Sequence, residues 1–282
     1  NGIALTVFLA HDGSLNGDWI ARYALHFAAG STARRLVVLH VEDANISGEP
    51  LHERLERLTE LGERMNVGVE VRILPMHAGV FGGLDDHLRQ QEDALVVTGA
   101  RVAGGRRGHL RGTISEKLLR QSKYGVVAIH VMQPGLLGDP KRVLLALTDN
   151  APAPTAILKL FAPAITHLDI VELETVSRLH FARLSEAEAA ALKRDGLSAA
   201  TRAEAGILSS TGLTAGRIDT HVRVTDDWPK QVAVEAGRYR AGLALVEMPS
   251  ATSGALSFGH PIEELMRIAP SDVAVYREAD AS

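Results

Sequence analysis

An internal repeat near the two ends of the chain constrains its fold most strongly. Residues 112–120 (GTISEKLLR) align without a gap on residues 259–267 (GHPIEELMR), and each copy is followed at equal distance by an apolar run, starting at Val126 or Val273. A repeat present twice, in a chain of 282 residues, indicates a duplicated domain rather than a solenoid. The alternative is a chance likeness between two helix-to-strand connections.

Composition excludes several classes of protein. Hydrophobic residues make up 46% and charged residues 23% of the chain, which is typical of a folded, globular protein. The net charge of -4 gives no electrostatic basis for binding nucleic acid or an anionic membrane, and no apolar stretch reaches the length of a membrane-spanning helix. The absence of cysteine excludes disulfides, thiolate metal sites and thiol catalysis. We expect a cytoplasmic protein, without nucleic acid or membrane as a partner.

The first half alternates short apolar runs with segments of helical periodicity. We predict strands at residues 3–10, 36–41, 67–74, 94–97 and 126–131, and helices at residues 15–29, 51–65, 80–91 and 114–121. Strands separated by helices of this length form right-handed βαβ units on a parallel sheet. The Pro- and Gly-containing segment 132–139 (MQPGLLGD) has no periodicity and is predicted to be a linker. The domains are therefore expected at residues 1–135 and 136–282.

The pattern restarts after this linker. We predict strands at residues 142–147, 168–173, 218–224, 243–247 and 273–276, with a helix beginning at residues 156–160. The second copy is longer than the first, and the surplus falls in residues 178–212, which are rich in Ala, Glu and Leu and are expected to be mostly helical. The last strand of an open sheet has an unpaired edge. Segments 126–131 and 273–276 are therefore expected to pair within the chain as a pseudo-dimer. The sequence does not decide whether two such chains also form a homodimer.

Residues 98–115 (TGARVAGGRRGHLRGTIS) have the composition of a phosphate-binding loop. They follow a buried strand and open a helix, whose backbone N–H groups can bind an anion. Thr113 and Ser115 add hydroxyl groups, and the loop is basic through Arg101, Arg106, Arg107, His109 and Arg111. The alternative is a surface loop whose arginines are simply solvated. Neither a P-loop nor a dinucleotide-binding glycine pattern is present.

The order of the elements, together with three loops, resembles the universal stress protein family. Its nucleotide motif is Gly, two residues, Gly, nine residues, then Gly-Ser/Thr, and Gly99, Val102 and Gly112-Thr113 stand at that spacing. Residues 11–14 (HDGS) are similar to the family's loop after the first strand, and residues 40–43 (HVED) to the end of its second strand. The resemblance implies an α/β fold of two tandem, doubly wound open parallel sheets, each with strand order 3-2-1-4-5.

The resemblance also implies a nucleotide site between the first and fourth strands of the first half. Its adenosine part would contact Ala10, Asp12, Val41, Thr98 and Gly99, its phosphates would contact Val102, Gly112, Thr113, Ile114 and Ser115, and His11 and Arg101 would lie in the same crevice. Val102 departs from the family's glycine, and a β-branched residue resists positive φ. Either the affinity for nucleotide falls, or the loop runs differently through Gly104 and Gly105.

The second half departs further from the motif. No glycine matching Gly99 follows residues 243–247, and His260-Pro261 replaces the hydroxyl group and removes an N–H donor. We expect no cofactor there. The 12 histidines show no metal-binding spacing, so we predict no metal site, and no paired catalytic carboxylates stand out because Asp85-Asp86 is interpreted as a solvated helix face.

The resemblance implies a stress-response protein that binds adenine nucleotide, specifically ATP with or without Mg²⁺, in its first domain. The resemblance implies that the protein has no enzymatic activity, or at most hydrolyses the nucleotide slowly. A second hypothesis is a nucleotide-free interaction scaffold of the same fold, motivated by Val102 and the eroded second copy. A third hypothesis is an ATP-using enzyme of the adenine-nucleotide hydrolase group. The sequence speaks against it, because residues 11–14 (HDGS) differ from the Ser-Gly-Gly-x-Asp-Ser loop that members of this group use after the first strand.

Overall fold

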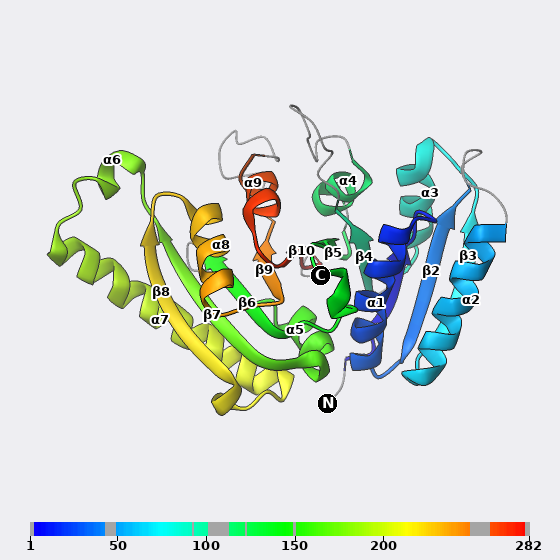
Figure 1. Cartoon of the computed structure of the whole chain (residues 1–282), viewed down its shortest axis with the longest axis horizontal. Helices are drawn as coiled ribbons and strands as arrows, with labels where there is room; N and C mark the ends of the chain where they lie inside the picture. Colours follow the sequence, from blue (N-terminus) through cyan, green and yellow to red (C-terminus); the bar gives the residue numbers. More distant parts are fainter. Residues whose placement is uncertain are drawn as a thin grey trace.

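Ten strands form one continuous sheet that runs through the whole molecule (Figure 1). The computed structural model describes residues 3–42, 49–91, 93–100, 113–121, 123–148, 151–248 and 260–279. Within these residues the strand order is β3-β2-β1-β4-β5-β10-β9-β6-β7-β8. Counted within each half, this is the order 3-2-1-4-5 twice, so the prediction of two tandem, doubly wound α/β sheets is confirmed.

The first half contains five strands and four α-helices among the described residues. Its strands are β1 (Thr6–Ala10), β2 (Arg35–Val41), β3 (Gly68–Leu74), β4 (Ala94–Gly99) and β5 (Gly125–His130). Its helices are α1 (Leu15–Gly30), α2 (Glu49–Arg64), α3 (Gly79–Leu88) and α4 (Ile114–Gln121). Every neighbouring pair of these strands is parallel, as the βαβ pattern predicts.

The second half repeats this arrangement with a longer helical connection. After the 3₁₀ turn η1 (Pro134–Leu136), its strands are β6 (Lys141–Thr148), β7 (Ile165–Thr175), β8 (Ile218–Thr225), β9 (Leu243–Glu247) and β10 (Asp272–Arg277). Its helices are α5 (Thr155–Phe161), α6 (Arg178–Phe181), α7 (Glu186–Thr211), α8 (Trp228–Arg238) and α9 (His260–Ile268), with the 3₁₀ turns η2 (Ala162–Ala164) and η3 (Ala215–Arg217). The surplus stretch is helical as expected, since it holds α6 and α7.

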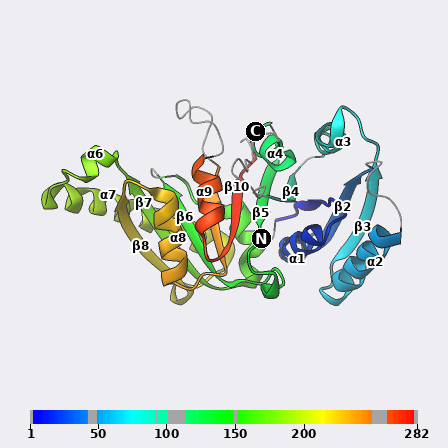
Figure 2. The same cartoon turned by 45° about the horizontal axis from the view of Figure 1, so that its top comes forward.

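The two halves meet through antiparallel pairing of β5 with β10. Val275 lies opposite Ala128, and the pairing extends over five residue pairs, from Val273 with His130 to Arg277 with Val126. The expected pairing of the two last strands within the chain is thus confirmed. Figure 2 shows β5 and β10 side by side at the centre of the sheet, with the other strands extending to both sides.

Helices cover both faces of the sheet and bury two apolar clusters. One cluster lies under α1, α2, α5 and α7 and continues across the junction of the halves, where Phe161 of α5 packs against Tyr23 and Phe27 of α1. The other lies under α3, α4, α8 and α9. Because each half divides its helices between the two faces, the connections diverge at the carboxyl ends of the strands, where crevices form.

One sequence interpretation is wrong. Asp85 of α3 is 4% exposed and therefore does not lie on a solvated face, whereas its neighbour Asp86 does. The Asp85 carboxylate accepts a hydrogen bond from the Tyr124 hydroxyl at 3.3 Å and pairs with Arg89 one turn later. The helical period places residue 85 on the inner side of α3, together with Leu84 and Leu88. None of the helices described is both long and apolar enough to cross a lipid bilayer.

Candidate functional site

A pocket of about 210 Å³ opens at the carboxyl ends of β1 and β4 in the first half. β1 leads into α1 on one face of the sheet, and the helix that follows β4 lies on the other face. Neighbouring strands whose connections leave in opposite directions create a crevice, and open α/β sheets bind their ligands in such crevices. The fold therefore provides a binding site at this position.

Nine of the twelve residues predicted for the site line this pocket. They are Ala10, His11, Asp12, Val41, Thr98, Gly99, Thr113, Ile114 and Ser115. The other three, Arg101, Val102 and Gly112, lie outside the described residues. Sequence reasoning missed five lining residues, namely Gly17, Ile20, Leu39, Val80 and Leu84. The signal for these residues was the helical period of α1 and α3 and the apolar run of β2, which were used only to place those elements.

His11 is fixed in one tautomer by its neighbours. Its Nδ1 accepts a hydrogen bond from the backbone N–H of Gly13 at 2.9 Å, so Nε2 carries the proton and donates it to Asp18 Oδ1 at 3.2 Å. Asp18 also pairs with Arg54 of α2. Burial raises the pKa of the Asp18 carboxyl, but the hydrogen bonds from His11 and Arg54 outweigh it and hold that pKa below the ordinary value. Asp18 therefore orients His11 as a carboxylate.

Asp12 directs its carboxylate from a tight turn at the mouth of the pocket. Its Oδ1 accepts hydrogen bonds from the backbone N–H and the hydroxyl of Ser14, at 3.0 and 2.5 Å. Ser14 in turn caps α1 by accepting from the N–H of Gly17. A Cβ atom at Gly17 would lie 2.8 Å from both Asp12 Oδ1 and the His11 ring, so only glycine lets the turn approach the helix. The turn is thereby fixed to the start of α1.

The amino terminus of α4 contributes hydroxyl groups to the opposite side of the pocket. Thr113 Oγ1 accepts a hydrogen bond from the N–H of Glu116 at 3.2 Å and lies 3.1 Å from Ser115 Oγ. Ser115 lines the pocket but is only 3% exposed to solvent. The amino end of a helix has a positive potential, and hydroxyl groups next to it can donate to an anion. This side of the pocket suits a phosphate group.

The remaining walls of the pocket are largely apolar. Leu39, Val41, Val80 and Leu84 bring aliphatic side chains from β2 and α3. At Gly99, a Cβ atom would lie 3.0 Å from the side chain of Asn16 and 3.4 Å from that of Ile20, so glycine at this position keeps the end of β4 close to α1. Aliphatic walls with a few polar groups at one end are typical of a site for a flat ring that carries a polar tail.

The corresponding end of the second half is only partly described. The described residues include β9, Met248 and the start of α9, but the segment between them lies outside them. Glu247 ends β9, and burial raises the pKa of its carboxyl. The prediction that the second half binds no cofactor is not tested by these residues.

Comparisons with known proteins identify the fold. No protein-family model matches the sequence, and no curated protein matches it. A universal stress protein from Archaeoglobus fulgidus has a similar structure, with a TM-score of 0.57, 17% identity, and coverage of 99% of this chain and 98% of that one. The chain has the universal stress protein fold. Both halves lie within the likeness, because it spans nearly the full length of each protein.

Two further structures share this tandem universal stress protein fold. A Pseudomonas aeruginosa protein of unknown function has a TM-score of 0.57 and 14% identity, covering 97% of this chain and 92% of that one. The cytoplasmic domain of a prokaryotic cation chloride cotransporter has a TM-score of 0.58 and 12% identity, covering 98% and 96%. At these identities the likeness is one of fold, and the same fold occurs as part of a membrane transporter.

Proposed function

We propose that the chain is a stress-response protein that binds an adenine nucleotide, specifically ATP, in the pocket of its first half. The observation that supports this most is the convergence of nine predicted site residues on one pocket at the crevice between β1 and β4. These residues come from four separate stretches of the sequence. A binding site is the simplest reason for such a mixture of aliphatic, carboxylate and hydroxyl groups in one place.

The described residues fit the parts of a nucleotide in order. Leu39, Val41 and Leu84 offer apolar surface to the adenine ring. The Asp12 carboxylate, at the mouth, would accept hydrogen bonds from ribose hydroxyls. Thr113 and Ser115, with the amino end of α4, would contact the phosphates, and in the sequence they directly follow the basic segment 101–111. When Mg²⁺ accompanies ATP, it offsets phosphate charge.

We propose binding rather than turnover as the primary role. Both ring nitrogens of His11 are engaged, Nδ1 by the N–H of Gly13 and Nε2 by Asp18. The histidine therefore has no ring nitrogen available to activate a water molecule in this arrangement. A protein that responds to nucleotide without consuming it suits the cytoplasm, where ATP is abundant.

The experiment is a calorimetric titration of the purified chain with ATP, with and without Mg²⁺. We expect one site per chain. We expect two variants to bind ATP more weakly. Leu84→Arg places a charged side chain in the apolar wall, and Asp12→Ala removes the carboxylate that would accept hydrogen bonds from the ribose. Asp86→Ala is the matched control, because Asp86 is an exposed carboxylate of the same half that does not line the pocket. No heat at millimolar ATP in the unmodified chain overturns the proposal.

A nucleotide-free interaction module is the second candidate. Val102 replaces the glycine of the nucleotide motif, and a cotransporter's cytoplasmic domain has the same tandem fold. This candidate predicts that native mass spectrometry of the freshly purified chain releases no nucleotide and that Leu84→Arg leaves the chain's role in cells intact. Bound nucleotide in that experiment, lost in the Leu84→Arg variant, favours the first candidate.

A further inference from the structure

Two strands of the second half carry mirrored pairs of metal-ligating residues. β7 contains His167-Leu-Asp169 and β8 contains Asp219-Thr-His221. Because side chains alternate along a strand, the two members of each pair point to the same face. The register places Asp169 directly beside Asp219 on the neighbouring parallel strand. Four potential ligands thus gather on one face, near the starts of the two strands.

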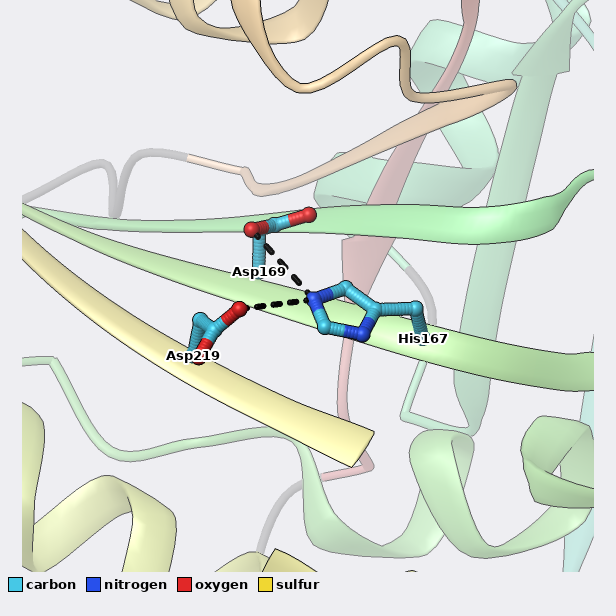
Figure 3. Close-up of side chains that lie close together, drawn as sticks. All are labelled: His167, Asp169 and Asp219. Carbon is cyan, nitrogen blue, oxygen red and sulfur yellow. Dashed lines mark ion pairs between the residues drawn. The ribbon is translucent and has the colours of Figure 1, made fainter. Parts of the chain in front are cut away.

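Three of these side chains converge on a common point (Figure 3). His167 Nε2 lies 3.0 Å from Asp219 Oδ2 and 3.7 Å from Asp169 Oδ1, and one ligand atom from each residue lies within 4.8 Å of the others. Ligand atoms about 2.0–2.2 Å from a zinc ion at tetrahedral angles are separated by roughly 3.2–3.6 Å. The spacing therefore approaches that of a metal site.

The convergent nitrogen lacks a hydrogen bond. His167 Nε2 is shielded from solvent and makes no hydrogen bond of acceptable geometry, although two carboxylates lie near it. Asp169 is 1% exposed, and buried carboxylates are costly unless they are paired or bind a metal. An ion between the three side chains would give the His167 nitrogen a partner and would add to the contacts of the Asp169 carboxylate.

Neighbouring residues hold Asp169 in place. Arg142 of β6 donates to Asp169 Oδ2 at 3.2 Å, and His221 Nε2 lies 3.3 Å from Asp169 Oδ1. The His221 ring stacks on Tyr239 with centroids 4.3 Å apart. Such outer contacts orient ligands in metal sites. The positive charge of Arg142 disfavours a nearby cation. The two carboxylates nevertheless outnumber this one guanidinium. Arg142 also donates to the carbonyl oxygen of Tyr239 at the carboxyl end of α8, where the helix dipole is negative.

We propose that His167, Asp169 and Asp219 bind a divalent transition-metal ion of the zinc class, with His221 as a positioning residue for Asp169. One imidazole nitrogen and two carboxylate oxygens form a mixed nitrogen and oxygen set that suits such ions. Asp219 has 63% of its side chain exposed, so the ion's remaining position faces solvent and holds water. The site lies at the amino ends of β7 and β8, far along the sheet from the nucleotide pocket in the first half.

The test uses the full chain, stripped with chelator and titrated with zinc chloride by calorimetry, with cobalt absorption as a second readout. We expect one ion per chain and a tetrahedral cobalt spectrum with an imidazole ligand. Asp219→Asn and His167→Gln are expected to weaken binding by at least about 100-fold, since loss of a ligand should exceed the roughly 10–100-fold loss typical of changes to outer contacts. Asp219 is exposed, so its variant is expected to fold, and circular dichroism checks this for both.

The matched control is His77→Gln. His77 forms an exposed pair with Asp86 at 2.8 Å in the first half, so its variant removes a histidine–carboxylate pair outside the cluster. Zinc affinity is expected to stay unchanged in it. Two results overturn the proposal: no saturable binding of zinc or cobalt by the unmodified chain, or equal binding in all three variants. In the first case the contacts of His167 with the two carboxylates only stabilise the pairing of β7 with β8, and Asp219→Asn lowers the thermal midpoint equally with and without zinc.

Discussion

The Tyr23 hydroxyl donates a hydrogen bond of 2.6 Å to Asp272 Oδ2, across the junction between the two halves. The second oxygen, Oδ1, accepts from the backbone N–H groups of Met132 and Gln133, each at 2.7 Å. One buried carboxylate thus connects α1, β10 and the segment after β5. Burial raises the pKa of the Asp272 carboxyl, and these three hydrogen bonds only partly offset that effect.

Tyr23→Phe is expected to destabilise the chain by about 1 to 3 kcal/mol at neutral pH, because a buried carboxylate loses a donor. The folded-state pKa of Asp272 lies above the ordinary 3.8, so its contribution to stability falls as pH rises from 3.8 through that pKa. Removing the donor raises the pKa further. The difference in the free energy of unfolding between variant and parent, measured by urea denaturation, should therefore become smaller as the pH is lowered toward 3.8.

Tyr124→Phe is the matched control for this prediction. The Tyr124 hydroxyl donates to Asp85 Oδ1 at 3.3 Å, within one half, and Asp85 keeps its pairing with Arg89. We expect a smaller loss, because the bond is longer and the carboxylate keeps its ion pair. Equal losses in the two variants, with no dependence on pH, contradict a special role for the junction carboxylate.

Gly30→Ala is expected to loosen the contact between the two halves. A Cβ atom at Gly30, the last residue of α1, would lie 1.6 Å from the carbonyl oxygen of Leu160 in α5. One helix must move, and overpacking of this kind costs about 1 to 3 kcal/mol. Thermal unfolding followed by circular dichroism measures the loss.

Gly206→Ala in α7 tests the opposite effect of the same substitution. A Cβ atom there would meet nothing closer than Thr155 Cγ2 at 4.0 Å. Alanine is expected to stabilise the helix by roughly 0.5 to 1 kcal/mol, because glycine is the poorer helix former. Loss of stability in both variants would show that space at the helix contact does not explain the Gly30 result.

Hydrophobic periodicity predicted the fold well because strands and helices bury different patterns of side chains. Strand order and the β5–β10 pairing also followed, from the repeat together with the family resemblance. Element ends were less predictable. The first strand was expected at residue 3 but begins at Thr6, since the carbonyl oxygens of Ile3 and Leu5 accept from Ser31 and Thr32 instead of entering the sheet ladder.

Contacts that depend on register could not be obtained from the sequence. His167 and Asp219 are 52 residues apart, and only the pairing of β7 with β8 brings them together. The alternating His-x-Asp and Asp-x-His patterns were the available signal, but histidines were compared only with motifs along one segment. The bond between Tyr23 and Asp272 depends on the packing of one half against the other, for which no local pattern exists.

Asp18→Asn is expected to release His11 and to change acid stability. The folded-state pKa of Asp18 lies below the ordinary 3.8, so its stabilising contribution is present above 3.8 and is lost as pH falls through the folded value. The variant should therefore lose stability at neutral pH and show a shallower acid transition. ATP affinity should fall with it, because the His11 ring is no longer fixed. An unchanged acid transition argues against the carboxylate–Arg54 pair.

The pair of Arg223 and Glu235 is predicted to couple β8 to α8. Glu235 is fully buried, and Arg223 donates to both its oxygens, at 2.9 and 3.0 Å. Burial raises the pKa of Glu235, but the hydrogen bonds from Arg223 outweigh this and lower it. Arg223→Met leaves the carboxylate with the half-exposed Arg238 as its remaining cation partner among the described residues. We expect a loss of about 3 kcal/mol.

Arg223→Met combined with Glu235→Leu is expected to cost less than the sum of the two single changes. The double variant removes the buried charge together with its partner, and residues in direct contact typically couple by about 0.5 to 3 kcal/mol. A double-mutant cycle in urea near neutral pH measures this coupling. At lower pH, protonation of Glu235 in the Arg223→Met variant should recover part of the lost stability, since removal of the Arg223 guanidinium raises the folded-state pKa of Glu235 relative to the parent. Strictly additive losses at every pH would mean that the two side chains stabilise the fold through separate contacts.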